Sequence, residues 1–348
     1  MRFLQIKMKK KILLVFSLFL LVLFFTNHKI IFYGIEQLRG QLNIVFNTKE
    51  IDEVLNDSSV PDSIKQKLLL IQEIKKFAVD SIGLKPTNNY STYYDQQGKP
   101  VLWVLTASPP FQMKSYEWHY PFLGNLSYKG FFEKEKGEKE KQLLDVKNYD
   151  TDLSTVGGWS TLGWFRDPVL SKMLRKSDGA LAELIIHELT HATVYIKGNV
   201  EYNENLATFV GEKGAEKFLT CKYPNDQSKI NEYKTRMHDE EVFGNYIVNC
   251  IDTLEKLYSE IRTSNNSSGK KYLLKYRKIA SLVLGIKNLP LQQMTKYEWN
   301  FKTTPLPNNT YFLSYSNYRK RLNSFETVFS DSCKGNLSAF VAREAENN

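Results

Sequence analysis

Two histidines and a glutamate stand at a spacing that can bind a metal ion and use it. Residues 187–191 read His187-Glu188-Leu189-Thr190-His191, which is an H-E-x-x-H pattern. On a helix, positions i and i+4 lie one turn apart on the same face, so the two imidazoles can bind one Zn²⁺. Glu188 stands beside the first ligand, where its carboxylate can take a proton from water that the metal activates. The alternative is a half-buried helix with incidental histidines, but a chance match is rare in a chain with 5 histidines.

A catalytic zinc site needs a third protein ligand and one open position. Gly198-Asn199 predicts the end of the helix that carries the motif, and residues 201–219 predict a second helix. A tight hairpin of these two helices brings the first turn of the second helix back beside the zinc. We favour Glu204 as the third ligand over Glu201, because Glu201 lies closer to the turn.

Further residues of the second helix follow from the same arrangement. Thr208 and Glu212 follow Glu204 at helical spacing, so they are candidates to orient a metal ligand by hydrogen bonding. Gly211 and Gly214 can allow the two helices to pack closely. Plain surface glycines are an equal alternative for these two positions.

The pattern along the chain predicts an α+β fold, with a small β-sheet before a mostly helical C-terminal half. Strand patterns occupy residues 90–94, 101–106, 128–132 and 160–165, and the first two flank a turn at 95–98 that predicts a hairpin. Helical patterns occupy residues 33–47, 64–82 and 133–141, and from Ser177 they continue almost to the end of the chain. Residues 264–269 form the clearest loop signal in this half.

Composition and charge exclude several classes of protein. The chain has 348 residues, of which 42% are hydrophobic and 24% charged, so a wholly disordered chain is excluded. The net charge is +9, but residues 1–33 hold six basic residues and no acidic one. The remaining excess of about +3 is too small to indicate a nucleic-acid partner. Three cysteines exclude a disulfide scaffold and a four-cysteine zinc site, and leave one bridge open, with Cys221 and Cys250 as the pair to test.

The N-terminal segment predicts attachment to a membrane. An apolar run of 14 residues, 12–25, follows basic residues between Arg2 and Lys11. No small-x-small cleavage site follows it, so we favour an uncleaved signal-anchor over residues 1–33 rather than a cleaved signal peptide or a buried core helix. The positive-inside rule then keeps the N-terminus in the cytoplasm and exports residues 34–348, which we expect to form the catalytic domain in a periplasmic or extracytoplasmic position.

Several short blocks occur in an order that resembles a known family. They are Tyr120-Pro121 with Tyr128-Lys129-Gly130-Phe131-Phe132, the run Ser160 to Pro168 (S-T-L-G-W-F-R-D-P), the H-E-x-x-H motif, the run Asn203 to Gly211 (N-E-N-L-A-T-F-V-G), and Asn308-Asn309 with Tyr318 and Phe325. From about residue 33 to the C-terminus, the chain resembles the bacterial family called putative zinc aminopeptidases. It departs from the family in lacking a lipoprotein cysteine, and in having Leu126-Ser127 where many members have a Val-Pro type of pair.

The resemblance implies a gluzincin-like metallopeptidase with a zincin-like helical half. The matching blocks make Tyr128, Asn309 and Tyr318 candidates to stabilise the oxyanion of the reaction or to contact substrate. A structural hydrogen bond in the core is the alternative for each of them.

Together these observations predict a membrane-anchored zinc metallopeptidase that hydrolyses peptide bonds in a peptide or protein substrate. The aminopeptidase subclass rests on the family name, because the G-x-M-x-N type of amine-binding motif is absent. An anchored endopeptidase or processing protease is the alternative within this class. A non-catalytic, membrane-tethered binding protein is the alternative outside it, although an intact Glu188 argues against that function.

Overall fold

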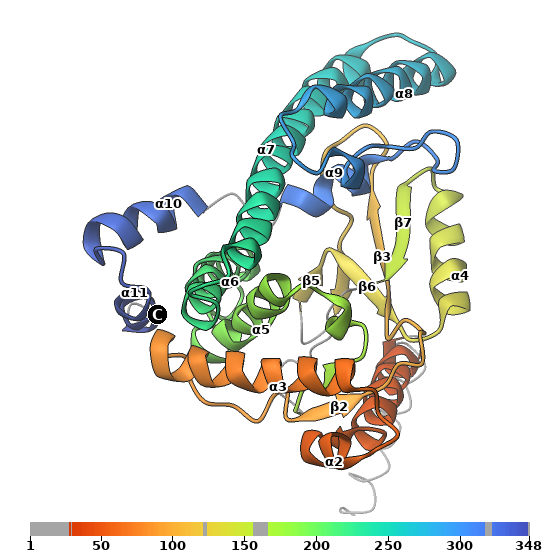
Figure 1. The fold of residues 1–348 in the computed structure, drawn as a ribbon. Coiled ribbons are helices and arrows are strands. Elements are labelled where there is room, and N and C mark those ends of the chain that lie inside the picture. The colour runs from red at the N-terminus through yellow and green to blue at the C-terminus, as the bar shows by residue number, and fades with distance from the viewer. Residues whose placement is uncertain (1–27, 29, 121–123, 156–165, 317–321, 347–348) are drawn as a thin grey trace, which may run out of the picture.

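Small sheets lie beside a larger set of helices in this chain (Figure 1). The computed structural model describes residues 28, 30–120, 124–155, 166–316 and 322–346. Within these ranges, the predicted α+β arrangement of a sheet region followed by a mostly helical half is confirmed. The predicted strand at 160–165 and the candidate Tyr318 lie outside the described residues.

The strands of the described ranges form three sheets. The first holds β1 (Lys49–Glu50), β2 (Thr92–Tyr94) and β8 (Val169–Leu170), with β2 in the middle, antiparallel to β1 and parallel to β8. The second is antiparallel and holds β6 (Tyr128–Phe131), β3 (Trp103–Ser108) and β7 (Asp150–Thr155), with β3 in the middle. The third pairs β4 (Trp118–Tyr120) with β5 (Gly124–Leu126).

The predicted hairpin between β2 and β3 is wrong. The turn itself forms, because the backbone N–H of Gln97 donates to Asp95 Oδ1 at 2.9 Å and Gly98 has a φ of 74°. However, β2 is already paired on both sides, by β1 and by β8, so it offers no edge to β3. The turn therefore passes the chain from the first sheet to the second.

Helices make up the rest of the regular structure. Residues 30–46 form the first described helix, and the predictions for 33–47, 64–82, 133–141 and the C-terminal half are confirmed. The prediction for 64–82 corresponds to α3 and the π-helical turn η1, which stops at Gly83 in a left-handed conformation. The bounds are α2 (Ile51–Asn56), α3 (Asp62–Phe77), η1 (Ala78–Ile82), α4 (Lys134–Asp145), η2 (Met173–Arg175), α5 (Asp178–Thr193), α6 (Val200–Lys222), α7 (Gln227–Thr263), α8 (Ser268–Gly285), η3 (Ile286–Asn288), η4 (Met294–Lys296), α9 (Asn309–Ser316), α10 (Leu322–Thr327), η5 (Val328–Ser332) and α11 (Leu337–Glu346).

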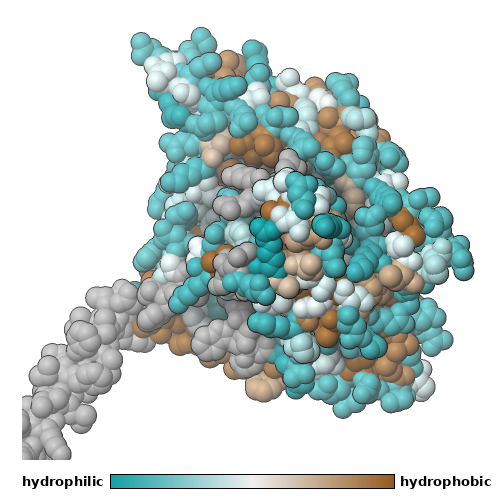
Figure 2. All heavy atoms as spheres, turned by 90° about the vertical axis from the view of Figure 1, so that its left-hand side faces the viewer, coloured by the Kyte–Doolittle hydropathy of each residue, from teal (hydrophilic) through white to brown (hydrophobic). Residues whose placement is uncertain are grey.

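The long helix α7 joins two hydrophobic cores (Figure 1). Its first turns contribute Ile230 and Tyr233 to the core around α3, α5 and α6. Its later turns, from Phe243 onward, pack with α8 and α9 in the second core. The face that carries α10 and α11 is mostly hydrophilic, with separate hydrophobic patches (Figure 2).

The predicted membrane anchor lies outside the described residues, whereas the possible disulfide can be compared with the structure. No helix in the described ranges is long and apolar enough to cross a membrane, and the apolar run at 12–25 lies outside those ranges. All three cysteines are free thiols, so the bridge left open between Cys221 and Cys250 does not form. Cys221 is exposed near the end of α6, whereas Cys250 is buried in the second core.

Candidate metal centre

Helix α5 places the H-E-x-x-H motif in its last two turns. The helix begins after Ser177, whose hydroxyl accepts from the backbone N–H of Ala180 at 3.4 Å, as an N-cap residue does. On the side away from the motif histidines, the helix buries apolar residues that include Ile185, Ile186 and Leu189. This burial fixes the rotation of the helix, so that His187 and His191 are presented on its half-buried side.

Helix α5 ends earlier than predicted, so the connection to α6 is longer than expected. The helix ends at Thr193, not at Gly198-Asn199, and Asn199 instead caps the start of α6 by accepting from the backbone N–H of Tyr202 at 3.2 Å. The buried amide of Asn203 accepts from the N–H of Ile196 at 2.9 Å and donates to its carbonyl at 2.8 Å. These two bonds fix the loop onto the first turn of α6, immediately before Glu204.

Of the two alternatives for Gly211 and Gly214, the structure shows close packing of the helices. A Cβ atom on Gly211 would lie 3.0 Å from the carbonyl oxygen of Glu183 and 3.3 Å from Cβ of His187. A Cβ atom on Gly214 would lie 3.0 Å from two side-chain carbons of Ile186. A larger residue at Gly211 would require α5 and α6 to move apart by a few tenths of an ångström, and Glu204 lies on the same helix as Gly211.

Three donor atoms converge between α5 and α6. His187 Nε2 and His191 Nε2 lie 3.2 Å apart; His187 Nε2 lies 3.5 Å from Glu204 Oε2, and His191 Nε2 lies 3.5 Å from the other oxygen, Glu204 Oε1. Ligand atoms at 2.0–2.1 Å from a tetrahedral Zn²⁺ are about 3.3 Å apart, so the spacing fits one such ion. Two imidazoles and a carboxylate are also the donor set of a catalytic zinc site. In the described part of the chain, this is the one cluster of His, Cys, Asp or Glu that could hold a metal ion.

The electrostatics of the cluster follow from its partial burial. The side chains of His187, His191 and Glu204 are 18%, 22% and 26% exposed. Burial lowers the pKa of His191 to about 4, with the charge of His187 acting in the same direction. Burial also lowers the pKa of His187, but its hydrogen bond to Glu204 and the surrounding carboxylates outweigh this and raise it. For Glu204, burial raises the pKa, but the bond to His187 and the two imidazoles bring it below its ordinary value.

Glu188 is half-buried, like the three donor residues, and lies close enough to His187 and Glu204 to feel their charges. Burial raises the pKa of its carboxyl group, and the carboxylates of Glu204 and Asp167 raise it further, while His187 opposes them. Tyr90 is fully buried near Glu188 and Asp167, and its hydroxyl has no hydrogen-bond partner among the described residues. Asp167 is 3% exposed, and its backbone N–H and carbonyl are bound by Asn89 and Tyr90.

Tyr128 is the candidate oxyanion donor that the structure brings to the metal centre. It opens β6 at 46% exposure, and burial of its hydroxyl, followed by the charges of Glu204 and Tyr195, raises its pKa. Tyr195 is 59% exposed and follows the end of α5 by two residues. Tyr128 therefore lies close enough to Glu204 and Tyr195 for their charges to raise its pKa.

Asn309 lies elsewhere. It is fully buried, and its side chain accepts from the hydroxyl of Tyr258 at 2.7 Å and donates to the carbonyls of Pro109, Pro110 and Gln112. Its backbone N–H donates to Asp150 Oδ2 at 2.9 Å. None of these partners belongs to the metal centre, so the contacts of Asn309 correspond to the structural alternative.

The remaining candidates lie along α6. Glu204, not Glu201, is in the donor cluster, as favoured from the sequence. Thr208 and Glu212 are half-buried one and two turns after Glu204, and the carbonyl of Glu212 accepts from the hydroxyl of Tyr233 at 3.2 Å.

Sequence reasoning gave no role to Tyr90, Asp167 or Tyr195. Asp167 stands in the quoted run Ser160 to Pro168, and that recurring block was the available signal for it. Tyr195 stands four residues after His191, but α5 ends at Thr193, so helical spacing does not determine where Tyr195 lies. A buried tyrosine such as Tyr90 carries no local signal, because its nearness to Glu188 depends on the fold.

Comparison with known proteins gives one match. A family model described as "Putative aminopeptidase" matches residues 32–347, which include the whole cluster and nearly the whole chain. The search of curated proteins and the search of solved structures gave no match.

Proposed function

Because the chain belongs to the family of putative aminopeptidases, we propose that it is a membrane-anchored zinc metallopeptidase, and within that class an aminopeptidase. The observation that carries this proposal is the convergence of His187, His191 and Glu204, with Glu188 beside them. Family membership supports a peptidase in general terms. The donor spacing supports zinc, since it matches what a tetrahedral ion requires.

Each residue of the proposed site has its own role in peptide hydrolysis. His187, His191 and Glu204 would hold the ion, which supplies a Lewis acid that activates water and polarises the scissile carbonyl. Glu188 accepts the proton of the attacking water and delivers it to the leaving amine nitrogen. The hydroxyl of Tyr128, whose pKa is sensitive to the charge of Glu204, would donate a hydrogen bond to the oxyanion that develops on the substrate.

Glu188→Gln tests the reaction, because it keeps the size of the side chain and removes the base. We expect zinc content to stay near that of the wild type, and the rate of hydrolysis of a peptide library to fall about 10²–10⁴-fold. Equal rates for Glu188→Gln and the wild type would refute the mechanism. A wild type that binds zinc and cleaves nothing would favour the binding-protein alternative.

A matched pair of variants tests the ligand set. Glu204→Gln and Glu201→Gln make the same chemical change one turn apart on α6. We expect Glu204→Gln to lose most of its zinc, as measured by elemental analysis of the purified protein, and Glu201→Gln to keep it. The reverse result would move the third ligand to Glu201.

Two further measurements decide the subclass and the location. A peptide blocked at its N-terminus that is still cut internally would make the enzyme an endopeptidase, whereas strict dependence on a free amine supports an aminopeptidase. For the anchor, we expect the full chain in the membrane fraction, with its catalytic domain outside the cytoplasm. A mature chain that begins near residues 27–34 in the soluble fraction would contradict an uncleaved anchor.

A further inference from the structure

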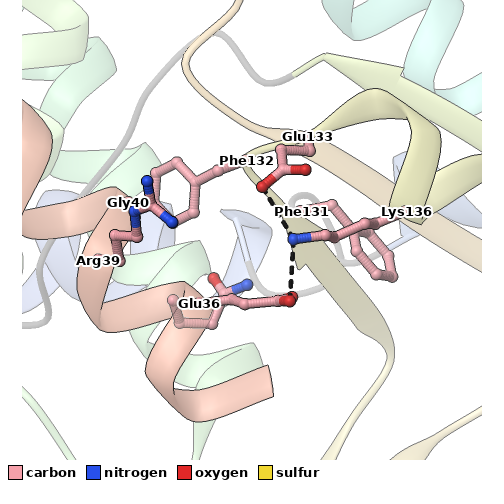
Figure 3. Close-up of a pocket in the computed structure, with 8 residues that line it drawn as sticks. Glu36, Arg39, Gly40, Phe131, Phe132, Glu133 and Lys136 are labelled. Atoms are coloured by element: carbon pink, nitrogen blue, oxygen red, sulfur yellow. Dashed lines mark hydrogen bonds and ion pairs between the residues drawn. The ribbon is translucent and has the colours of Figure 1, made fainter. Parts of the chain in front are cut away.

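The helix of residues 30–46 is fixed to the domain along one face (Figure 3). Tyr33 Oη and Gln37 Nε2 both donate to the carbonyl oxygen of Gly130, at 2.9 and 3.0 Å. Gly130 lies in β6, the edge strand that begins with Tyr128. The helix therefore supplies hydrogen-bond donors to a backbone carbonyl of this edge strand.

The same face is held by close packing and by an ion pair. A Cβ atom on Gly40 would lie 2.2 Å from the ring of Phe132, so this ring rests directly on the helix backbone. Lys136 of α4 donates to Glu36 Oε1 at 2.8 Å and to Glu133 Oε1 at 2.8 Å, and Figure 3 shows this bridge between the helix and α4. These contacts set which side of the helix faces away from the domain.

The opposite side of the helix is apolar and exposed. Ile35, Leu38 and Phe46 are 55%, 51% and 77% exposed. At 100° per residue, their positions fall within an arc of about 80°, opposite to Tyr33, Gln37 and Gly40. An amphipathic helix that exposes its apolar side indicates a site of contact with a membrane or with another protein.

The charges on this helix fit an anionic lipid surface. Its single acidic residue, Glu36, is neutralised by Lys136 on the side that faces the domain. Arg39 is exposed beside the apolar arc, although it lies close enough to Glu133 to lower the pKa of that carboxyl group. The outward side of residues 30–46 therefore carries no acidic group that would repel phosphate headgroups.

The position of the helix in the chain decides between a bilayer and another protein. The apolar run ends at Phe25, and the five residues from there to Ile30 can span at most about 18 Å. If residues 12–25 anchor the chain, the helix must begin within that distance of the bilayer. We propose that the helix of residues 30–46 lies on the membrane surface, with Ile35, Leu38 and Phe46 inserted among the lipids. This inference rests on the anchoring part of the proposed function.

Photo-crosslinking tests this contact without any need for enzymatic activity. The full chain is reconstituted in vesicles of phosphatidylcholine and phosphatidylglycerol, with p-benzoylphenylalanine in place of Leu38 or, separately, of Ile35. The control carries it in place of Val146, which is 83% exposed at the far end of α4. We expect a mass shift of one phospholipid on illumination at Leu38 and at Ile35, and no shift above background at Val146.

The outcomes separate this inference from the proposed function. Protein that floats with the vesicles but gives no lipid adduct at Leu38, or as much at Val146, overturns the inference and leaves the anchor in place. A crosslinked dimer from Leu38 without lipid adducts overturns it in favour of a second copy of the chain. Protein that does not float with vesicles overturns both the anchor and the inference, whereas the zinc chemistry is judged by the Glu188→Gln experiment alone.

Discussion

Replacing Gly211 with alanine should perturb the proposed metal centre without changing any residue proposed to bind metal or substrate. The new methyl group would lie 3.0 Å from a backbone oxygen, the carbonyl of Glu183, and 3.3 Å from Cβ of His187. Neither neighbour is the end of a flexible side chain, so the two helices must separate by a few tenths of an ångström. Glu204 lies seven residues earlier on the same helix, about 10 Å away, and moves with it.

Two opposing effects set the size of the change in stability. Alanine is favoured over glycine in a helix interior by up to about 1 kcal/mol, which stabilises the variant. Forcing a methyl group into a closely packed contact costs about 1–3 kcal/mol, which destabilises it. We therefore expect a net loss of about 0–3 kcal/mol in the free energy of unfolding of the metal-free protein. For zinc, we expect affinity to fall about tenfold or more, as when a group that orients a ligand is changed.

The assay combines urea unfolding of the metal-free protein with a competitive zinc titration. Gly34→Ala is the matched control, because Gly34 is also in a helix but has no atom within 4 Å of its new methyl group among the described residues. We expect Gly34→Ala to gain up to about 1 kcal/mol and to keep its zinc affinity. If Gly211→Ala behaves like this control in both measurements, the close approach of α5 and α6 does not position Glu204.

Other consequences of the structure can be measured directly. Lys275 is fully buried and binds Asp150 at 2.5 Å, so Lys275→Met should cost about 3–5 kcal/mol in urea unfolding, because it leaves a buried carboxylate without its cationic partner. A loss under about 1 kcal/mol would show that the pair is solvated. Burial raises the pKa of Asp178, but hydrogen bonds from two lysines and Tyr223 outweigh this and bring the pKa down to about 2. The stability that Asp178 contributes is therefore present above its ordinary pKa of 3.8 and is lost as the pH falls towards 2. Acid unfolding of Asp178→Asn should lack this component, and an unchanged acid limb would contradict it. Thiol labelling of the denatured, unreduced protein should count three free cysteines, and fewer than three would reveal a bridge.

The parts of the centre that could be predicted are those fixed by local spacing. Once residues 178–193 are helical, the side chains of His187 and His191 must share a face, whatever else the protein does. The prediction of Glu204 as the third ligand required only one more assumption, that the next helix turns back along the first. The ranges of α3 and α4 could be predicted for the same reason, since a helix period can be recognised within one segment.

The parts that could not be predicted depend on pairings between distant segments. The turn at Asp95–Gly98 has the residues of a hairpin, but the place beside β2 is taken by β8, more than 70 residues later in the chain. Asn309 stands in a recurring block and yet holds Tyr258 and three carbonyls in a buried cluster. A block that recurs can therefore reflect packing as well as chemistry, and the sequence alone does not separate the two.

The run Asn203 to Gly211 contains residues that determine packing together with a residue proposed for the chemistry. Asn203 binds both backbone groups of Ile196 and so fixes where α6 begins. Glu204 then points to the histidines, and Gly211, two turns later, lets α6 approach the backbone of α5. On another side of the helix, Phe209 packs against Phe340 of α11 at 5.1 Å between ring centroids. A carboxylate at position 204 is therefore not sufficient for the proposed metal centre, because its distance from His187 is set by residues that are not themselves proposed ligands.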